Sequence, residues 1–579
     1  MAFNINASKG KYDVIIVGSG AGGGMAGYVL AHAGLKVLML ESGPFFDPAK
    51  DSLQMRWPWE SPRRGASTNR AFGDFDGAFG GWEIDGEPYT NSEGSEFRWF
   101  RSRMLGGRTN HWGRISLRFG PKDFKGGSFD GATDDWPISY EEVKPYYDKV
   151  DILLGVYGTN EGLEDDPDGI FLKPPKPRLH ELLIAEAARK KGIPVIPGRG
   201  SVLTEPLKNN NQRGVCFNCG QCGRSCKVYG DFSSSSALVI PAIRTGNLEV
   251  LPNSLVREVL VDGDGLAKGV SYISKEDMQE YQVYGKQVIL AASACESARI
   301  LLNSKSRQHP QGLANSSGVV GKYLHDSTGV SVAAYLPQLK NRKRYNEDGV
   351  GSLHVYSPWW LDNSKLDFPR GYHIEYGGGM NMPSYGYLND LPRFNGALAN
   401  VNGAGKKSGG YGRSLKEEYR DYFGTKVVLA GRGLAIARKD NYCEIDPNTV
   451  DKYGIPVLKF HYKWHDAEIK QGKHMQDTFH DLFTGMGAVI TSAYVGADKH
   501  YGLKKPGEII HEVGTVRMGD DPKTSALNKW CQAHDCKNLF VVDGAPFVQQ
   551  GDKNPTWTIL ALSMRTSEYI LEQRKRRNL

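Results

Sequence analysis

Long apolar runs are missing from this 579-residue sequence. A helix that crosses a bilayer needs about 20 consecutive apolar residues, and no stretch approaches that length. The first ten residues, MAFNINASKG, are polar and do not resemble a signal peptide. We therefore expect no membrane span. We expect either a cytoplasmic location or, as we favour, a periplasmic one reached by export together with a partner that carries the signal.

A strong excess of charge of one sign is also absent. The net charge is +7 from 72 basic and 65 acidic residues, which gives no case for a nucleic-acid partner. Repeats and low-complexity segments are not found either, so solenoids and disordered linkers are excluded as the main architecture. The length instead predicts two or more globular domains.

Cysteine is scarce, with 8 residues in the chain, yet half of them lie in the stretch CFNCGQCGRSC at 216–226. Their spacing is C-x2-C-x2-C-x3-C. Zinc sites with four cysteines normally use two knuckles separated by a dozen or more residues. A ferredoxin-type run has this spacing, but there proline follows the fourth cysteine, whereas here Lys227 follows. An iron–sulfur site, a zinc loop, and disulfides or free thiols all remain open.

The other four cysteines carry less information. Cys531 and Cys536 are spaced for a short disulfide or for two packed thiols, and Cys295 and Cys443 are expected to be buried as small apolar side chains.

The N-terminal segment contains every part of a dinucleotide-binding unit in order. DVIIVG is an expected buried parallel strand, and it is followed by the pattern GxGxxG at Gly18, Gly20 and Gly23. Gly18 permits a tight turn, Gly20 lets the backbone approach a pyrophosphate, and Gly23 lets the helix pack on the strand. The second strand, KVLMLE, ends at Glu41, whose carboxylate is placed to accept from a ribose hydroxyl.

Later segments extend this unit. A hairpin is expected over 246–273, and a strand, turn and helix over 286–304. A buried strand is expected in CKNLFVVDGAPF at 536–547. The last helix is expected to begin with Asn554 as N-cap and Pro555 at its first position.

Together these segments resemble the glucose–methanol–choline (GMC) oxidoreductases. The matches are the N-terminal fingerprint, GGRTNHW, AASACESARILLNS, HEVGTVRMG and VVDGAPF…NPTWTILAL, and they extend over nearly the whole chain. The resemblance implies an α/β fold in which a Rossmann-like FAD-binding domain is assembled from residues 11–135, 215–330 and 505–579. A substrate-binding domain of sheet and helices is implied for 136–214 and 331–504. The latter is rich in Trp, Tyr and Asn, residue types that suit a sugar site.

The resemblance also implies roles for individual residues. His511, in HEVGTVRMG, corresponds to the family's catalytic base, a role that suits a side chain titrating near neutral pH. Asn554 corresponds to a second active-site residue that orients by hydrogen bonding. Whether His111 bonds covalently to the flavin is left open. The residues expected to contact FAD are Gly18, Gly20, Gly23, Glu41, Gly107, Asn110, His111, Val256, Asp543, Gly544, Pro555 and Thr556.

Two segments, DDWPISYEEVKPYYDKVDILLGVYG and LANSSGVVGKYLHD, resemble more narrowly the catalytic subunits of bacterial FAD-dependent sugar dehydrogenases. That branch implies a 3Fe-4S cluster on Cys216, Cys222 and Cys226, with Cys219 as an additional thiol that would permit 4Fe-4S. It also implies a small accessory subunit with an export signal, and a cytochrome c-type electron acceptor.

The resulting hypothesis is a dehydrogenase of a sugar or glycoside, with the C3 hydroxyl favoured and a 3-keto sugar as product. The alternatives are an oxygen-using oxidase without a cluster, a C1 glucose dehydrogenase, and a non-catalytic flavoprotein subunit for electron transfer.

Overall fold

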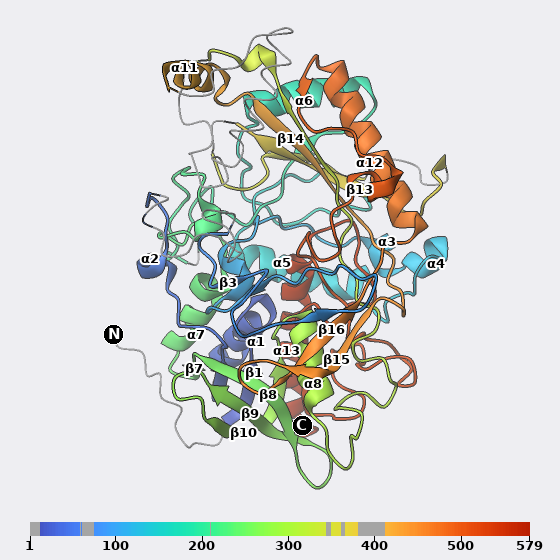
Figure 1. Ribbon diagram of the computed structural model, residues 1–579. Coiled ribbons are helices and arrows are strands. Elements are labelled where there is room, and N and C mark those ends of the chain that lie inside the picture. Colours follow the sequence, from blue (N-terminus) through green and yellow to red (C-terminus); the bar gives the residue numbers. More distant parts are fainter. Residues whose placement is uncertain are drawn as a thin grey trace.

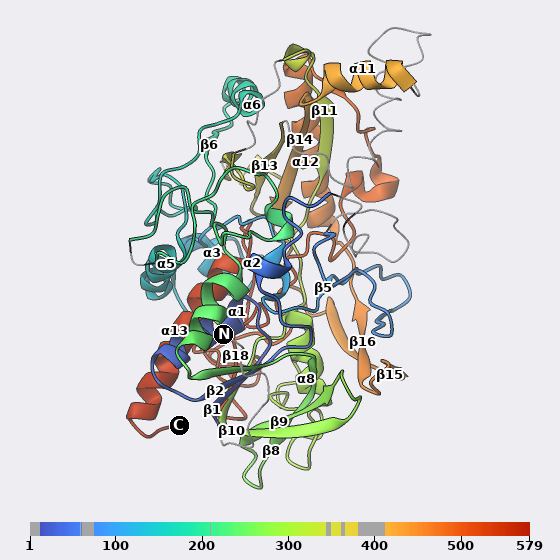
Figure 2. The ribbon, with the colours of Figure 1, turned by 90° about the vertical axis from the view of Figure 1, so that its left-hand side faces the viewer.

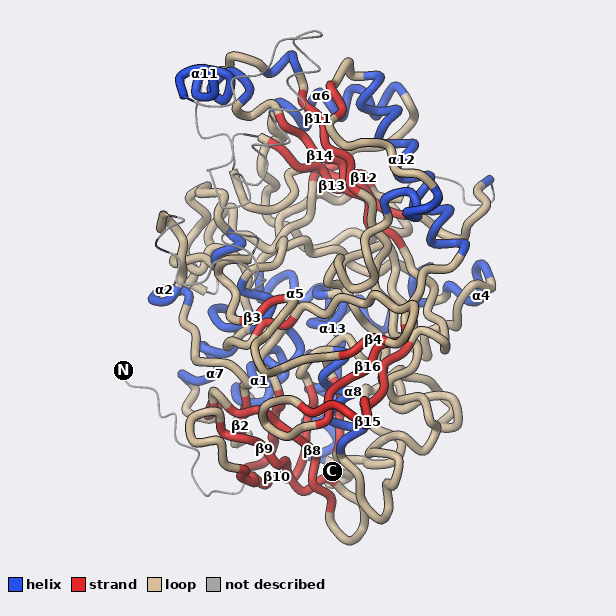
Figure 3. Tube along the Cα trace, viewed as in Figure 1, coloured by secondary structure: helices blue, strands red, loops and turns tan. Residues whose placement is uncertain are grey.

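The computed structural model describes residues 12–57, 60, 75–208, 210–342, 349–359, 365–379 and 412–579. Most of its strands gather in two groups toward opposite ends of the molecule, with loops, helices and the short strand β3 (Gly80–Gly81) between them (Figure 3). Part of the aromatic-rich segment that we associated with substrate, residues 360–364 and 380–411, lies outside the described residues.

The first group is a seven-stranded sheet in the order β7-β2-β1-β10-β9-β8, with β18 paired to β10. The expected parallel core is confirmed, since β1 lies between β2 and β10 and is parallel to both. The expected hairpin is also present, because β8 and β9 pair antiparallel. The elements are β1 (Tyr12–Val17), α1 (Ala21–His32), β2 (Val37–Leu40), β7 (Leu248–Leu251), β8 (Ser254–Val261), β9 (Ala267–Ser274), β10 (Glu280–Leu290), α8 (Ala294–Asn303), β18 (Leu539–Val541) and α13 (Thr556–Lys575).

Helix α1 packs very closely on this sheet, against α13 on its other side (Figure 2). A Cβ atom on Gly23 would lie 2.0 Å from the carbonyl oxygen of Gly18, and one on Gly22 would lie 2.1 Å from that of Val542. Gly18 itself has a φ of 96°, a conformation that side chains other than glycine's rarely adopt. The glycine pattern is therefore required by backbone contacts that no larger residue permits.

The second group is a six-stranded sheet in the order β17-β11-β14-β13-β12-β6, at the opposite end of the molecule from β1 and β10 (Figure 1). Helix α12 packs beside it, and its Met475, Phe479 and Phe483 enter a separate apolar core. The elements are β6 (Ile196–Pro197), β11 (Ser331–Tyr335), β12 (Val355–Ser357), β13 (Tyr372–Gly378), β14 (Lys426–Gly433), α12 (Asp466–Gly485) and β17 (Val489–Ile490).

Two segments expected in the substrate-binding domain contact the core of the first sheet. Helix α5 (Tyr140–Leu154) packs there, and so does β16 (Pro456–His461), which pairs with β15 (Tyr442–Val450) and β4 (Thr90–Asn91). The domain boundaries given above therefore stay a prediction. Among the helices in the described ranges, none is both long and apolar enough to cross a membrane.

The contact at Gly23 leads to a test of the fold. We expect Gly23→Ala to destabilise the protein by an amount at or above the upper end of the roughly 1–3 kcal/mol typical of overpacking, because the added methyl meets backbone that cannot rotate away. Gly20→Ala is the matched control, since a Cβ there has no atom within 4 Å. The measurement is thermal unfolding of both variants without added ligand. Equal midpoints for the two variants would contradict the packing argument.

Candidate active site

A cavity of about 400 Å³ brings the two sheets' residues together. One wall comes from the glycine turn after β1 and the C-terminal segment, and the other from strands β13 and β14. Every residue predicted for cofactor binding or catalysis lines this cavity except Gly23 and Asn110. Segments more than 500 residues apart in sequence thus meet at one place.

The cavity wall near β1 has the features of a dinucleotide cradle. Helix α1 starts at the wall with Gly20 as N-cap, and no side chain caps it and no acidic residue lies in its first turn. The positive end of this helix is therefore available to a phosphate. Gly20 is open on its side-chain face, as a close approach of pyrophosphate requires.

Glu41 sits at the end of β2, at the position expected for a ribose-binding carboxylate. The backbone N–H groups of Gly43 and Ser19 donate to it, at 2.9 and 3.3 Å, and the Ser19 hydroxyl donates as well. Burial raises the pKa of Glu41, and these donors together with Arg103 oppose that rise. The residues present therefore fit the adenosine half of FAD.

The segment of Gly107 to Asn110 forms a short 3-10 helix beside the glycine turn. Asn110 points away from the cavity: its Nδ2 donates to the carbonyl of Leu105 at 2.7 Å, and its Oδ1 accepts from Ser235 Oγ at 2.8 Å. Its side chain holds the shape of the loop and does not line the cavity, whereas the sequence predicted that Asn110 contacts FAD. His111 lines the cavity, and its Nε2 lies 3.0 Å from Ser102 Oγ.

The C-terminal strand delivers further cavity residues. Asp543 follows β18 and accepts from the Ser297 hydroxyl and from Ala545 N. Burial raises its pKa to about 6. Helix α13 begins at Thr556 with Pro555 as its N-cap, one residue later than the sequence predicted. Its first turn nevertheless faces the cavity as expected.

His511 and Asn554 are in contact at the cavity wall. Asn554 Nδ2 lies 3.1 Å from His511 Nε2. On the other side of the ring, Ser327 Oγ lies 3.1 Å from His511 Nδ1, and the Gln550 amide donates to that hydroxyl oxygen at 2.9 Å. Asn554 Oδ1 is buried, and no residue in the described part of the chain hydrogen-bonds to it. An oxygen in that state is suited to a ligand that donates a proton.

The turn that carries His511 rests on a buried carboxyl group. Asp326 accepts from the backbone N–H groups of His511, at 2.9 Å, and Ile509, at 3.3 Å. Burial, with the nearby charge of Glu512, raises the pKa of Asp326 to about 7. These two contacts fix the backbone of the turn that carries His511.

Burial also decides the charge of His511. Burial first, and then the positive charge of Arg432, lower the pKa of His511 to about 3, although Glu375 acts in the opposite direction. The imidazole is therefore neutral at physiological pH.

Arg432 and Glu375 themselves were missed in the sequence. They lie on β14 and β13 and line the same cavity, with Arg432 Nη2 3.1 Å from Glu375 Oε2. No local motif marks them, because only strand pairing brings the two together. Arg108 was missed too, although it follows the predicted Gly107; it pairs with Glu512 at 2.6 Å.

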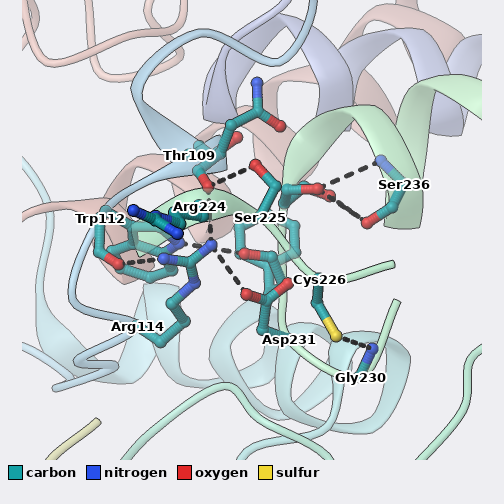
Figure 4. A network of polar contacts seen from close by, with 12 residues as sticks. Thr109, Trp112, Arg114, Arg224, Ser225, Cys226, Gly230, Asp231 and Ser236 are labelled. Atoms are coloured by element: carbon teal, nitrogen blue, oxygen red, sulfur yellow. Dashed lines mark hydrogen bonds and ion pairs between the residues drawn. The ribbon is translucent and has the colours of Figure 1, made fainter. Parts of the chain in front are cut away.

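The cysteine-rich loop is fastened to the back of this site (Figure 4). Ser225 Oγ donates to the carbonyl of Asn110 at 2.7 Å, and Arg114 Nη2 donates to the same oxygen at 2.9 Å. Arg114 also pairs with buried Asp231 at 2.8 Å. The loop thus supports the Gly107–Asn110 segment from behind, and its cysteines do not line the cavity.

The thiols of this loop do not have the arrangement that an iron–sulfur cluster needs. All eight cysteines of the chain lie in described segments and are free, which makes the alternative of a disulfide at 216–226 or at Cys531 and Cys536 wrong. Cys219 Sγ accepts from Gln54 Nε2 at 2.9 Å, and Cys226 Sγ accepts from Gly230 N at 3.3 Å. Within the described ranges, no three His, Cys, Asp or Glu side chains are placed to hold a metal ion.

A dinucleotide cradle that opens onto a histidine and an amide is suited to a flavoprotein oxidoreductase acting on CH–OH groups. The family comparison agrees. Residues 12–328 and 437–563 match the N-terminal and C-terminal profiles described as GMC oxidoreductase, so the chain belongs to that family, which binds FAD.

Similar proteins cover the chain from end to end. The 2-methyl-1,2-propanediol dehydrogenase of Mycolicibacterium austroafricanum is 28% identical, over 98% of this chain and 96% of its own. The fructose dehydrogenase large subunit of Gluconobacter japonicus is 25% identical, over 97% and 98%. The gluconate 2-dehydrogenase flavoprotein of Pantoea cypripedii is 25% identical, over 97% and 94%.

Solved structures share the fold at low identity. A formate oxidase from Aspergillus oryzae superposes with a TM-score of 0.66 at 15% identity, covering 98% of this chain and 100% of its own. Pyridoxine 4-oxidase from Mesorbium loti superposes with a TM-score of 0.60 at 16% identity, covering 97% of this chain and 99% of its own. The expected α/β architecture is thus confirmed.

Glu41 provides a test of the cradle. We expect Glu41→Gln to weaken FAD binding by about 10- to 100-fold, because a charged acceptor for a ribose hydroxyl is lost while the volume is kept. The measurement is the dissociation constant of FAD from fluorescence titration of apoprotein. Glu249→Gln is the control, since Glu249 accepts from Tyr12 on the same sheet but does not line the cavity. An equal effect in both variants would show a general loss of stability instead.

Proposed function

We propose that this protein is an FAD-dependent dehydrogenase that oxidises a secondary hydroxyl of a sugar or glycoside, with His511 as the general base. The observation that carries the proposal is the contact of His511 Nε2 with Asn554 at the wall of the cavity that also holds the dinucleotide cradle.

The hydrogen bonds around His511 favour one tautomer. Ser327 Oγ accepts from Gln550, which leaves a second lone pair to accept from His511 Nδ1–H. In that assignment, Nε2 carries the lone pair and accepts from Asn554 Nδ2 at 3.1 Å; a substrate hydroxyl that takes the place of this contact can give its proton to Nε2. Gln550 and Ser327 act as positioning residues, because they fix which ring nitrogen is the base.

Asn554 complements the base. Its side chain does not titrate. The amide instead holds the substrate oxygen beside Nε2 while the proton moves to His511. Bound FAD supplies the two-electron acceptor for the hydride that leaves the carbon.

The substrate class follows from family and relatives. Two of the relatives above carry names of dehydrogenases for a sugar and a sugar acid, which supports a polyhydroxylated substrate. We favour the C3 hydroxyl, giving a 3-keto sugar. Oxidation at C1 of glucose is the second candidate, and identification of the product by NMR separates the two. Oxygen consumption during turnover would instead support an oxidase.

The structure assigns no residue to the transfer of electrons away from the reduced flavin. Because the four thiols of 216–226 do not fit a cluster as they are arranged, no step passes through them. The cysteine spacing and the resemblance to sugar dehydrogenase subunits support an iron–sulfur cluster, a cytochrome acceptor and a small export subunit. Iron and acid-labile sulfide analysis after anaerobic purification decides the matter. Stoichiometric iron would support the cluster that the cysteine spacing indicates. Absence of iron would support the arrangement of free thiols in the structure.

Removal of the base tests the proposal. We expect His511→Ala to slow reduction of the flavin by substrate about 10²- to 10⁴-fold, the usual contribution of general base catalysis. The measurement is anaerobic stopped-flow bleaching of the flavin. FAD content, and reduction by dithionite, should be unchanged. Bleaching at the wild-type rate would contradict the assignment of His511 as the general base and would favour a non-catalytic flavoprotein.

The first turn of α13 supplies a second test. If its positive end stabilises the anionic reduced flavin, Thr556→Asp should make the midpoint potential more negative, because a carboxylate opposes the helix dipole. Thr556→Ser is the control, because serine keeps a neutral hydroxyl group at this position. The potential is measured by dye-coupled titration, and an unchanged value in Thr556→Asp would remove the dipole from the mechanism.

A further inference from the structure

Strands β13 and β14 place an ion pair in the wall that faces the base. Glu375 is on β13 and Arg432 on β14, and both line the cavity together with His511 and Asn554. Their side chains are only 12% and 20% exposed, so the pair is largely desolvated. Neither residue belongs to the dinucleotide cradle, which is built from the first sheet.

The pair is held in place by further contacts. Arg432 Nη1 donates to the carbonyl of Gly431 at 2.8 Å. The second carboxylate oxygen of Glu375 lies 3.4 Å from His373 Nε2, and His373 is buried with its Nδ1 against the carbonyl of Asp552. This framework fixes both charged groups before a ligand arrives, which reduces the entropy cost of recognition.

A buried pair of this kind needs a reason other than stability. Desolvation of two charges offsets much of their mutual attraction, and an apolar pair of similar volume often stabilises a fold as well. Its chemistry is instead suited to recognition: the carboxylate accepts a hydroxyl proton, and the guanidinium donates to a hydroxyl oxygen. Because the pair has no net charge, it does not favour an anionic substrate over a neutral one.

We propose that Glu375 and Arg432 form a subsite that binds a hydroxyl group next to the one that is oxidised, so that the enzyme selects neutral vicinal diols, as sugars and glycosides contain, over simple alcohols. This assignment rests on the proposed function. It makes both residues determinants of specificity, whereas His511 carries the proton transfer.

The test measures preference as well as rate. Flavin bleaching is followed with methyl glucoside and with its 2-deoxy and 4-deoxy analogues, which lack one neighbour of the C3 hydroxyl. We expect the wild-type protein to prefer methyl glucoside over one deoxy analogue by about 10- to 100-fold in kcat/KM, as a site built around a hydroxyl does. We expect Glu375→Gln and Arg432→Gln each to reduce that preference to less than about 3-fold, mainly by lowering kcat/KM for methyl glucoside.

The pH dependence gives an independent readout. Arg432 lowers the pKa of His511 and Glu375 raises it. The acid limb of kcat/KM should therefore move to higher pH in Arg432→Gln and to lower pH in Glu375→Gln. Opposite shifts would place both charges beside His511, and an unmoved limb in both variants would contradict that placement.

Two further variants protect the test against misfolding. Glu375→Gln/Arg432→Gln leaves no unpaired buried charge and should fold where a single variant does not. Glu444→Gln is the matched control, because Glu444 also pairs with a histidine but is exposed and outside the cavity.

The outcomes separate the two proposals. If methyl glucoside and its analogues all fail to bleach the wild-type flavin, the proposed function fails. If they bleach it and the preference survives in the single and double variants, the subsite is overturned while the proposed function stands.

Discussion

Helix α1 packs against the backbone of the turn after β1 and against the backbone just after β18. The site depends on this packing. At Gly23 the helix touches the turn after β1, and at Gly22 it touches the chain just after β18. One helix thus joins the N-terminal strand to a strand more than 500 residues later. The glycine turn after β1 and the C-terminal segment that contains Asn554 share a cavity because this contact brings them together.

A second layer of order comes from hydrogen bonds behind the cavity wall. The carbonyl of Asn110 accepts from both Ser225 and Arg114, and its side chain is fixed by Leu105 and Ser235. The cysteine-rich loop is part of that support. Its position explains why a loop outside the cavity contributes to the shape of the site, whether or not it carries any electron.

The opposite wall has a different origin and a different task. The first sheet supplies the cradle, and the second sheet supplies charged groups directed at the reacting side. Arg432 and burial keep His511 neutral, while Glu375 opposes them. If Glu375 and Arg432 bind substrate as proposed, changes in β13 and β14 would alter substrate selection without disturbing the first sheet.

Contiguous motifs in the sequence predicted residues that the structure brings to one cavity, because strand, glycine turn, helix and acid interact locally. This holds for Gly18, Gly20 and Glu41, and for the segments around His511 and Asn554. Only the tertiary structure decided the features that depend on strand pairing and distant contacts. These are the Glu375–Arg432 pair, the contacts of Asn110 away from the cavity and the free state of the cysteines. Spacing along a chain predicts which thiols can meet, but the packing of the loop decides how they are oriented.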